Sequence, residues 1–203
     1  KKTAIANVTN FPKSPYYINL NGQWDFYFNE YPKNVPEDIA SDVNNTDPGW
    51  TVITVPGNWE MQGHGVAIYT NTAYDFSPIN PHPPDLPDKN PVGVYRRRDI
   101  TIPSEWIDEE RDIFLQVGAA KTGLYAYVNG IEVGYSEDSK DPADFLINKY
   151  VKKNDQNVVT FLIYKYATGS YLEDQDMWRL GGIERDVVIY SQPNIHIRDF
   201  KFV

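Results

Sequence analysis

The chain has 203 residues, 41% of them hydrophobic, and a formal net charge of −9 at pH 7. A chain of this length buries about 70% of its unfolded surface, so it can form a core without a metal or disulfides. The absence of cysteine excludes disulfides, thiolate catalysis and cysteine-based zinc sites. Without a basic patch or an apolar run near the ~18 residues of a membrane helix, we expect neither nucleic acid nor a membrane as partner.

The first residues, Lys1 to Asn7, contain two lysines but no apolar segment behind them. The sequence therefore predicts no secretory signal peptide within the chain.

Alternation of apolar and polar residues, which is typical of strands, dominates the chain, and no convincing amphipathic helix is found. In chain order, strands are predicted at 22–28, 50–55, 92–102, 113–117, 124–128, 131–135, 157–166 and 183–191, and a last one begins at 195–203. Asn129 and Gly130 separate two alternating runs and predict a type I′ hairpin, because both positions of that turn need a positive φ. In the first strand, Trp24, Phe26 and Phe28 share one face and are predicted to lie in the core.

Three segments between these strands are predicted to be loops. Residues 136–156 are polar, and five apolar or aromatic residues within them are expected to reach the core, namely Phe145, Leu146, Ile147, Tyr150 and Val151. Residues 31–49 are rich in proline, aspartate and asparagine and have room for one helical turn. Residues 57–91 are the least regular stretch, and six prolines follow Ser77 within it. Long loops of this kind in compact domains are often functional.

About eight to ten strands at irregular spacing, without an internal repeat, predict an all-β fold. We expect a single domain over 1–203, a mostly antiparallel β-sandwich of jelly-roll type. The chain is also rich in aromatics, with 15 Tyr, 9 Phe and 5 Trp. In such a fold aromatic rings either fill the core or stack on sugar rings, and composition does not separate the two uses.

The residues that could carry chemistry are carboxylates and one amide. His64, His82 and His196 fit no metal-binding spacing. Three acids, Glu173, Asp174 and Asp176, lie in one loop with Tyr171 and Trp178 on either side. Three interpretations of this loop are open. It is a solvated acidic turn, it binds sugar hydroxyls or a hard cation, or it supplies the acid pair of a glycosidase. Asn71, among aromatic residues, is either a turn cap or a sugar ligand.

Several segments resemble, in the same order, the beginning of bacterial β-galactosidases of glycoside hydrolase family 2. They are LNGQWDF at 20–26, VPGNWEM at 55–61, IYTN at 68–71, VNG at 128–130, VGY at 133–135, EDS at 137–139, GSYLEDQDMWR at 169–179, GI at 182–183 and RDV at 185–187. The eleven-residue block at 169–179 and its order relative to IYTN are the most specific parts of this resemblance.

The resemblance implies the N-terminal, jelly-roll sugar-binding domain of such an enzyme. In family members an immunoglobulin-like domain and a TIM barrel with both catalytic glutamates follow it, and these would be its partners. No catalytic residue is therefore expected within this chain, which is expected to be inactive alone. The resemblance implies that Asn71 and Asp176 bind galactosyl hydroxyls, and that Asp176 also ligates sodium. Supporting roles are expected for Tyr69, Tyr171, Glu173, Trp178 and Arg179.

The chain alone is expected to need no cofactor, whereas sodium and magnesium are possible in the full-length enzyme. Where some relatives have Asp and Gln, this chain has Thr168 and Glu137, which puts a peripheral magnesium site at these positions in doubt. The resemblance implies a bacterial protein of the cytoplasm or the periplasm.

Alternatives to the β-galactosidase interpretation are a free-standing carbohydrate-binding module and the same domain of a β-glucuronidase or β-mannosidase. A self-sufficient glycosidase built on Glu173, Asp174 or Asp176 has least support, because acids one to three residues apart on a loop rarely span a glycosidic bond.

Overall fold

The structure is a computed structural model that describes residues 14–44, 46, 48–77, 79–197 and 199–202. The predictions about a signal peptide at Lys1 to Asn7 and about the two ends of the domain fall wholly or partly outside these residues.

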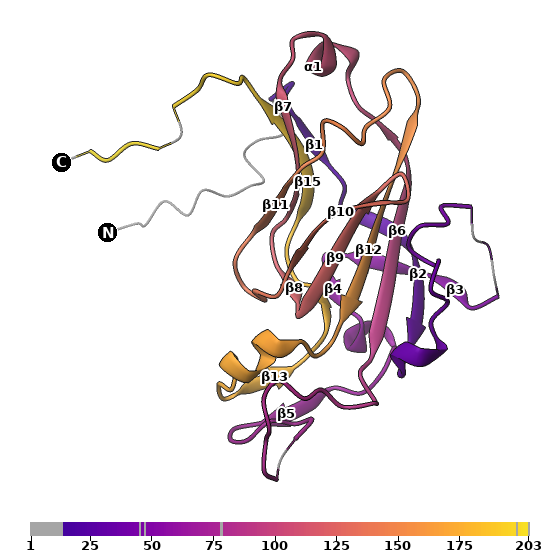
Figure 1. Cartoon of the computed structure of the whole chain (residues 1–203), viewed down its shortest axis with the longest axis vertical. Helices are drawn as coiled ribbons and strands as arrows, with labels where there is room; N and C mark the ends of the chain where they lie inside the picture. Colours follow the sequence, from indigo (N-terminus) through magenta and orange to yellow (C-terminus); the bar gives the residue numbers. More distant parts are fainter. Residues whose placement is uncertain (1–13, 45, 47, 78, 198, 203) are drawn as a thin grey trace.

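Two large antiparallel sheets form the body of the molecule (Figure 1). The four-stranded sheet has the order β1 (Tyr17–Asn19), β15 (Val187–Gln192), β7 (Asp112–Val117), β11 (Ala143–Leu146). The six-stranded sheet has the order β10 (Ile131–Ser136), β9 (Gly123–Val128), β12 (Gln156–Tyr164), β6 (Val92–Thr101), β2 (Gly22–Asn29), β3 (Trp50–Val55).

Two small sheets complete the strand pairing of the described residues. One consists of β4 (Gly57–Asn58), β14 (Gly182–Ile183) and β8 (Ala120–Lys121), and the other of β5 (Ile68–Thr70) and β13 (Met177–Arg179). The helical elements are α1 (Ser104–Asp108) and the 3-10 turns η2 (Pro32–Asn34), η3 (Glu60–Gln62) and η4 (Thr168–Leu172). The mostly antiparallel β architecture agrees with the sequence-based prediction.

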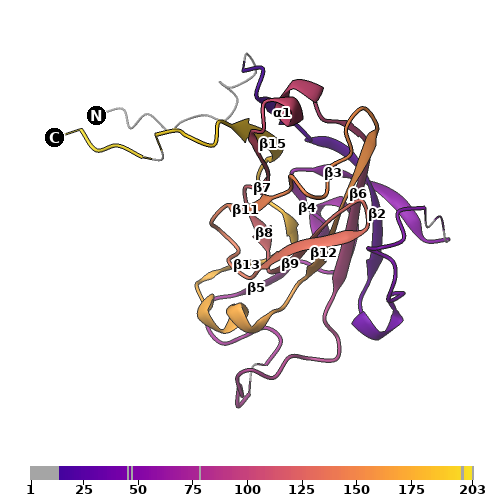
Figure 2. The same ribbon diagram turned by 45° about the horizontal axis from the view of Figure 1, so that its top comes forward.

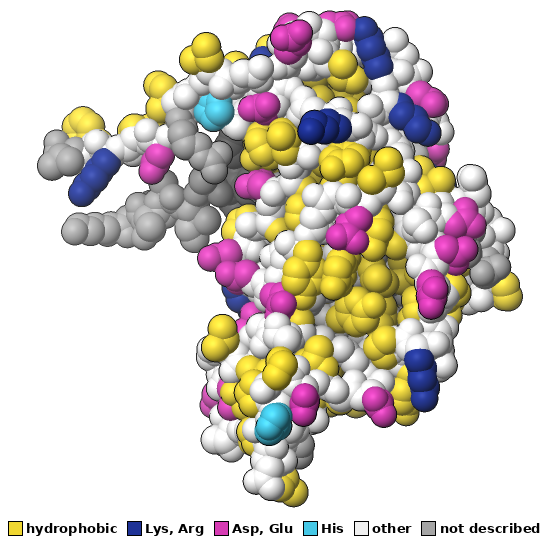
Figure 3. All heavy atoms as spheres, viewed as in Figure 1, with side chains coloured by type: hydrophobic (Ala, Val, Ile, Leu, Met, Phe, Trp, Pro, Cys, Tyr) yellow, Lys and Arg dark blue, Asp and Glu magenta, His cyan; other side chains and the backbone are white. Residues whose placement is uncertain are grey.

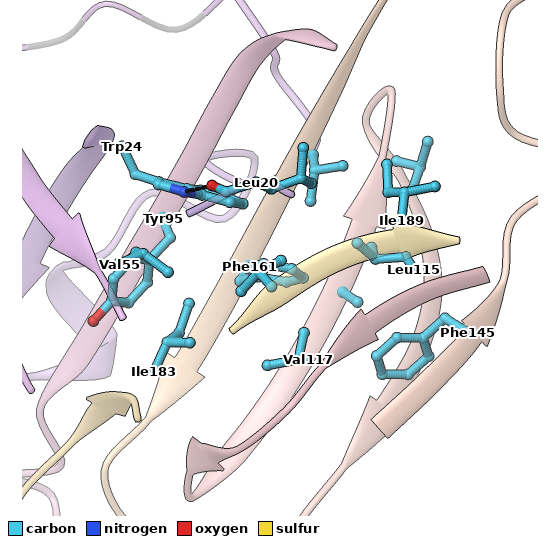
Figure 4. Packing of buried hydrophobic residues seen from close by; sticks show 14 of the residues in the cluster. Leu20, Trp24, Val55, Tyr95, Leu115, Val117, Phe145, Phe161, Ile183 and Ile189 are labelled. Carbon is cyan, nitrogen blue, oxygen red and sulfur yellow. Dashed lines mark hydrogen bonds between the residues drawn. The ribbon is translucent and has the colours of Figure 1, made fainter. Parts of the chain in front are cut away.

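The main core lies between the two large sheets (Figure 4). Trp24 of β2 stacks on Phe161 of β12 with ring centroids 5.4 Å apart, and its indole N–H donates to the Leu20 carbonyl over 2.8 Å. Leu115 of β7 and Ile189 of β15 meet them from the other sheet. Alternation produces this arrangement, because every second residue of a strand points to the same face.

The predicted core face of β2 is confirmed for two residues and is partly right for the third. Trp24 and Phe26 are fully buried, whereas Phe28 is half-buried at the end of the strand. The predicted hairpin is also confirmed. Asn129 and Gly130 have φ values of 52° and 82° and join β9 to β10, as a type I′ turn requires.

Four predictions about secondary structure were wrong. The loop predicted over 136–156 contains strand β11, which pairs with β7. No described residue beyond Gln192 forms a strand, because no partner strand supplies hydrogen bonds, and the apolar side chains there are strongly exposed. The strand predicted at 183–191 is two strands, since β14 pairs with β4 and β8 while β15 pairs with β1 and β7. A short helix, α1, was missed because five residues are too few for a helical period, although buried Trp106 anchors it.

The predicted loop over 57–91 does contain short regular elements, namely β4, η3 and β5. Its proline-rich end, as far as it is described, forms no strand, as the missing N–H donors predict. The β5–β13 ribbon lies at the end of the sandwich opposite α1 in both views (Figures 1 and 2). Among the described residues no helix is long and apolar enough to cross a membrane.

Candidate functional site

The β5–β13 ribbon brings Asn71 and Asp176 to the same end of one small structure. In its antiparallel register Met177 is opposite Thr70, Trp178 is opposite Tyr69, and Arg179 is opposite Ile68. Asn71 directly follows β5 and Asp176 directly precedes β13, so the same register continued by one step makes them neighbours. Both residues are exposed. Two polar side chains that are 105 positions apart in the sequence therefore lie side by side at the tip of the ribbon.

The three acids of the loop before β13 have different surroundings. Glu173 is directed inward, where its carboxylate accepts hydrogen bonds from Ser139 Oγ (2.7 Å) and Ser139 N (3.1 Å). Asp174 Oδ1 accepts a hydrogen bond from Arg179 Nη2 at 2.8 Å. Asp176 pairs with no cation and accepts only from the Tyr69 hydroxyl, and its side chain remains exposed, so it is the acid of this loop that is open to a ligand.

Tyr69 and Trp178 form the aromatic face of the ribbon. The Tyr69 hydroxyl donates to Asp176 Oδ1, and its ring contacts that of Trp178 with centroids 5.5 Å apart. The hydrogen bond to Asp176 raises the pKa of Tyr69 above its ordinary value. Both rings are about half exposed, at 54% and 56%, which leaves apolar surface free beside the carboxylate.

Tyr171 supports the ribbon from the side rather than facing its tip. Its ring packs edge-on against Tyr74 (5.0 Å) and Phe76 (5.2 Å), and its hydroxyl donates to the Asp85 carbonyl at 2.5 Å. The Tyr74 hydroxyl donates back to the Tyr171 carbonyl at 2.7 Å. These contacts attach η4 to the loop that follows Asn71, so they fix the relative position of the two segments that carry the site.

Two cations lie beneath the ribbon and are buried. Arg179, 5% exposed, donates to the Glu173 carbonyl at 2.5 Å as well as to Asp174. Lys121, 6% exposed, has its ammonium 3.8 Å from Met177 Sδ, and burial lowers the pKa of this amine. Arg179 therefore shapes the acidic loop from behind, in agreement with a supporting role.

A buried ion pair that the sequence analysis did not identify holds the base of the ribbon. Lys165 Nζ and Glu60 Oε1 are 2.7 Å apart, with side chains only 4% and 1% exposed. Glu60 Oε2 accepts the backbone N–H of Gly181 at 2.8 Å, two residues after β13. Gly181 also lies against Trp59, where an added Cβ would be 2.0 Å from the indole ring. Glu60 lies within the VPGNWEM segment, but no local pattern marked it as buried.

The described residues contain no group of three or more histidines and acids arranged to hold a metal ion. At the tip of the ribbon Asp176 offers a carboxylate, whose Oδ1 already accepts from Tyr69. Hard cations take about six oxygen ligands, so Asp176 fits such an ion only as one ligand among others. At the other position, Glu137 Oε2 accepts hydrogen bonds from Thr168 Oγ1 (2.6 Å) and from Gly169 N.

Comparison with known proteins identifies the family. Residues 17–193 match the model of the sugar-binding domain of family 2 glycosyl hydrolases. A "Beta-galactosidase" of Psychromonas ingrahamii is 41% identical over 180 residues, which are 89% of this chain and 17% of that protein. A "Beta-galactosidase" of Yersinia pestis is 41% identical over 189 residues, 92% of this chain and again 17% of the relative. The chain thus spans about one sixth of the length of these relatives.

Solved structures with the same fold include β-glucuronidases. One from Bacteroides uniformis has a TM-score of 0.62 at 24% identity and covers 88% of this chain and 18% of its own. One from Bifidobacterium dentium has a TM-score of 0.64 at 18% identity, over 89% of this chain and 30% of its own. Likeness at this identity concerns the fold alone. The family match over residues 17–193 shows that the chain belongs to the sugar-binding domain family of the family 2 glycosyl hydrolases.

Proposed function

We propose that this chain acts as the N-terminal sugar-binding domain of a family 2 β-galactosidase. In this role Asn71 and Asp176 bind the galactosyl ring, while glutamates outside the chain perform the hydrolysis of terminal β-galactosides. The observation that carries the proposal is the β5–β13 register, which makes these two exposed side chains neighbours. The names of the relatives at 41% identity support the choice of a galactosidase.

The chemistry of the two side chains suits a sugar. A carboxylate accepts hydrogen bonds from two adjacent hydroxyls, and an amide both donates and accepts. The Asp176 carboxylate is oriented by the Tyr69 hydroxyl, and the half-exposed rings beside it offer apolar surface to the carbon face of a sugar. No described cation is exposed at the tip to pair with an anionic sugar, since Arg179 and Lys121 are buried. This favours a neutral galactoside over a glucuronide.

The sodium role is part of the same proposal. Asp176 would contribute a carboxylate oxygen to a hard cation whose remaining ligands come from other parts of the longer enzyme and from the sugar. Magnesium would bind elsewhere in that enzyme, because no group of three acids or histidines among the described residues surrounds Glu137 to hold a metal ion.

The decisive experiment is Asp176→Asn in the longer protein that contains this chain. We expect kcat to fall together with affinity, by about tenfold to a hundredfold, because the lost charged hydrogen bonds strengthen in the transition state. The response to sodium should weaken as well. Asp144→Asn, at an exposed acid of β11 on the four-stranded sheet, is the matched control. Unchanged kinetics and sodium response in Asp176→Asn would refute the assigned role.

Two further measurements address the alternative functions. The longer protein should turn over a nitrophenyl β-galactoside much faster than the corresponding β-glucuronide or β-mannoside. The 203-residue chain alone should turn over none of them, and turnover by the chain alone would revive the self-sufficient glycosidase.

A further inference from the structure

A separate surface away from the β5–β13 ribbon lies on the outer face of the six-stranded sheet. Hydrophobic side chains gather over β9, β12 and β6 on the side drawn in Figure 3. In β9, Leu124 and Ala126 point into the core, so Tyr125 between them points outward. A cleft of about 420 Å³ opens there, bounded on one side by Leu86 and Pro87 of the proline-rich loop.

Four tyrosines line this cleft, and we call it the tyrosine cleft after three of them, Tyr125, Tyr135 and Tyr164. Tyr135 of β10 is directly opposite Tyr125, with ring centroids 4.4 Å apart. Tyr164 of β12 meets Tyr125 edge-on at 6.0 Å. Tyr135 is 41% exposed, which leaves part of a ring open to a ligand. The rings hold one another in place, so the surface is formed before any ligand arrives.

The polar groups of the tyrosine cleft remain able to bind a ligand. Neither the Tyr125 nor the Tyr164 hydroxyl has a hydrogen-bond partner among the described residues. Glu137 at one end of the cleft accepts from Thr168, Gly169 and Tyr135. Burial alone would raise the pKa of Glu137, but these hydrogen bonds outweigh it and the pKa is lowered, so the group is ionised at neutral pH. Hydroxyl donors, a fixed carboxylate acceptor and aromatic surface thus meet in one cleft.

We propose that the tyrosine cleft is a second carbohydrate subsite, separate from Asn71 and Asp176, that binds a neutral saccharide. Ligand pockets commonly have volumes of about 300–1,000 Å³, and a few placed polar groups among aromatic side chains give them orientation. The carboxylate of Glu137 excludes acidic sugars by repulsion, as no described cation lines the cleft. The volume suits one or two sugar units, such as those of a galactoside chain held beyond the ribbon.

The test is titration of the isotope-labelled 203-residue chain with galactose, lactose and galacturonate, followed by backbone NMR. Neutral sugars should shift resonances around Tyr125, Tyr135 and Tyr164 with a Kd of about 1–10 mM, a usual range for weak binding. Galacturonate should bind at least about tenfold more weakly.

Variants separate the tyrosine cleft from the ribbon. Tyr135→Ala should weaken binding at least about tenfold, and Glu137→Gln should let galacturonate bind as well as galactose. Tyr190→Ala, at a tyrosine of the four-stranded sheet stacked on Phe114, should leave binding unchanged. The double variant Asn71→Ala, Asp176→Ala should also retain it, whereas hydrolysis by the longer protein should fall, because it depends on sugar binding at the ribbon.

Three results would overturn the proposal. The first is the absence of shifts at the tyrosine cleft with about 50 mM sugar. The second is loss of those shifts in the Asn71, Asp176 double variant but not in Tyr135→Ala. The third is a change in the same resonances with protein concentration and without sugar, which would make this face a contact between two copies of the chain.

Discussion

The Tyr69 hydroxyl donates to Oδ1 of Asp176 across the β5–β13 ribbon, which links an aromatic ring to the exposed acid of the site. Asp176 precedes β13 and has no other hydrogen-bond partner among the described residues, so Tyr69 selects the direction in which the carboxylate points. A carboxylate held in one orientation loses less entropy when it binds a sugar.

Tyr69→Phe in the longer enzyme removes this hydrogen bond and retains the ring contact with Trp178. We expect kcat/KM for a nitrophenyl β-galactoside to fall by about tenfold, equivalent to about 1.4 kcal/mol, with an unchanged Tm. Tyr190→Phe is the matched control, because the Tyr190 hydroxyl also donates to an aspartate, Asp144, at 3.2 Å. If both variants keep wild-type kcat/KM, Asp176 needs no orienting partner.

Substitutions of Glu173 and of Asp176 should affect the free energy of unfolding differently, although both residues belong to one acidic loop. Glu173→Gln weakens the hydrogen bonds from Ser139 and should lower the free energy of unfolding by about 1–2 kcal/mol. Asp176→Asn removes an exposed carboxylate and should leave the free energy of unfolding within about 0.5 kcal/mol of the wild type. Urea unfolding of the 203-residue chain measures both. A larger loss of stability in Asp176→Asn than in Glu173→Gln would contradict the assignment of Glu173 to stability and of Asp176 to ligand binding.

The buried pair of Glu60 and Lys165 is expected to support the ribbon through stability. Glu60→Ala leaves the Lys165 ammonium buried without its carboxylate and releases the N–H of Gly181, at a cost of about 3–5 kcal/mol in unfolding free energy. Asp108→Ala breaks an exposed ion pair, in which the Lys153 side chain is 43% exposed and that of Asp108 is 56% exposed. This substitution should cost less than about 1 kcal/mol. Equal effects of the two substitutions would show that the Glu60 pair has no special role.

The larger strands could be predicted from the sequence because each carries an alternating or a continuous apolar run over six to ten residues. β7 has alternate buried positions, whereas β6 begins with five buried residues in a row. The ribbon could not be predicted in this way, since β5 and β13 have three residues each and the Tyr69–Asp176 hydrogen bond joins residues 107 positions apart. Asn71 and Asp176 were identified by resemblance. Glu60 and Lys165 were missed, because a charged residue in one sequence looks the same whether its partner is solvent or a buried ion 105 positions away.

His64 gives the chain a specific dependence of stability on pH. Its ring packs against Phe26 at 4.9 Å and Phe28 at 5.7 Å, and burial lowers its pKa below the ordinary value of 6.5. The unfolded chain therefore binds a proton at His64 more readily than the folded chain does. The contribution of neutral His64 to the free energy of unfolding is fully present above pH 6.5. It should fall as the pH drops from there toward the lowered pKa.

Urea unfolding of the wild-type chain between about pH 7.5 and 5.5 should show this decline, because this window lies above the range in which most carboxylates titrate. His64→Gln cannot take up the proton and should flatten the decline, even if it lowers stability at every pH. His82→Gln, at an exposed histidine of the proline-rich loop, should leave the slope unchanged. A slope that persists in His64→Gln would assign the pH dependence to another group. Burial of His64 would then not be the cause of the decline.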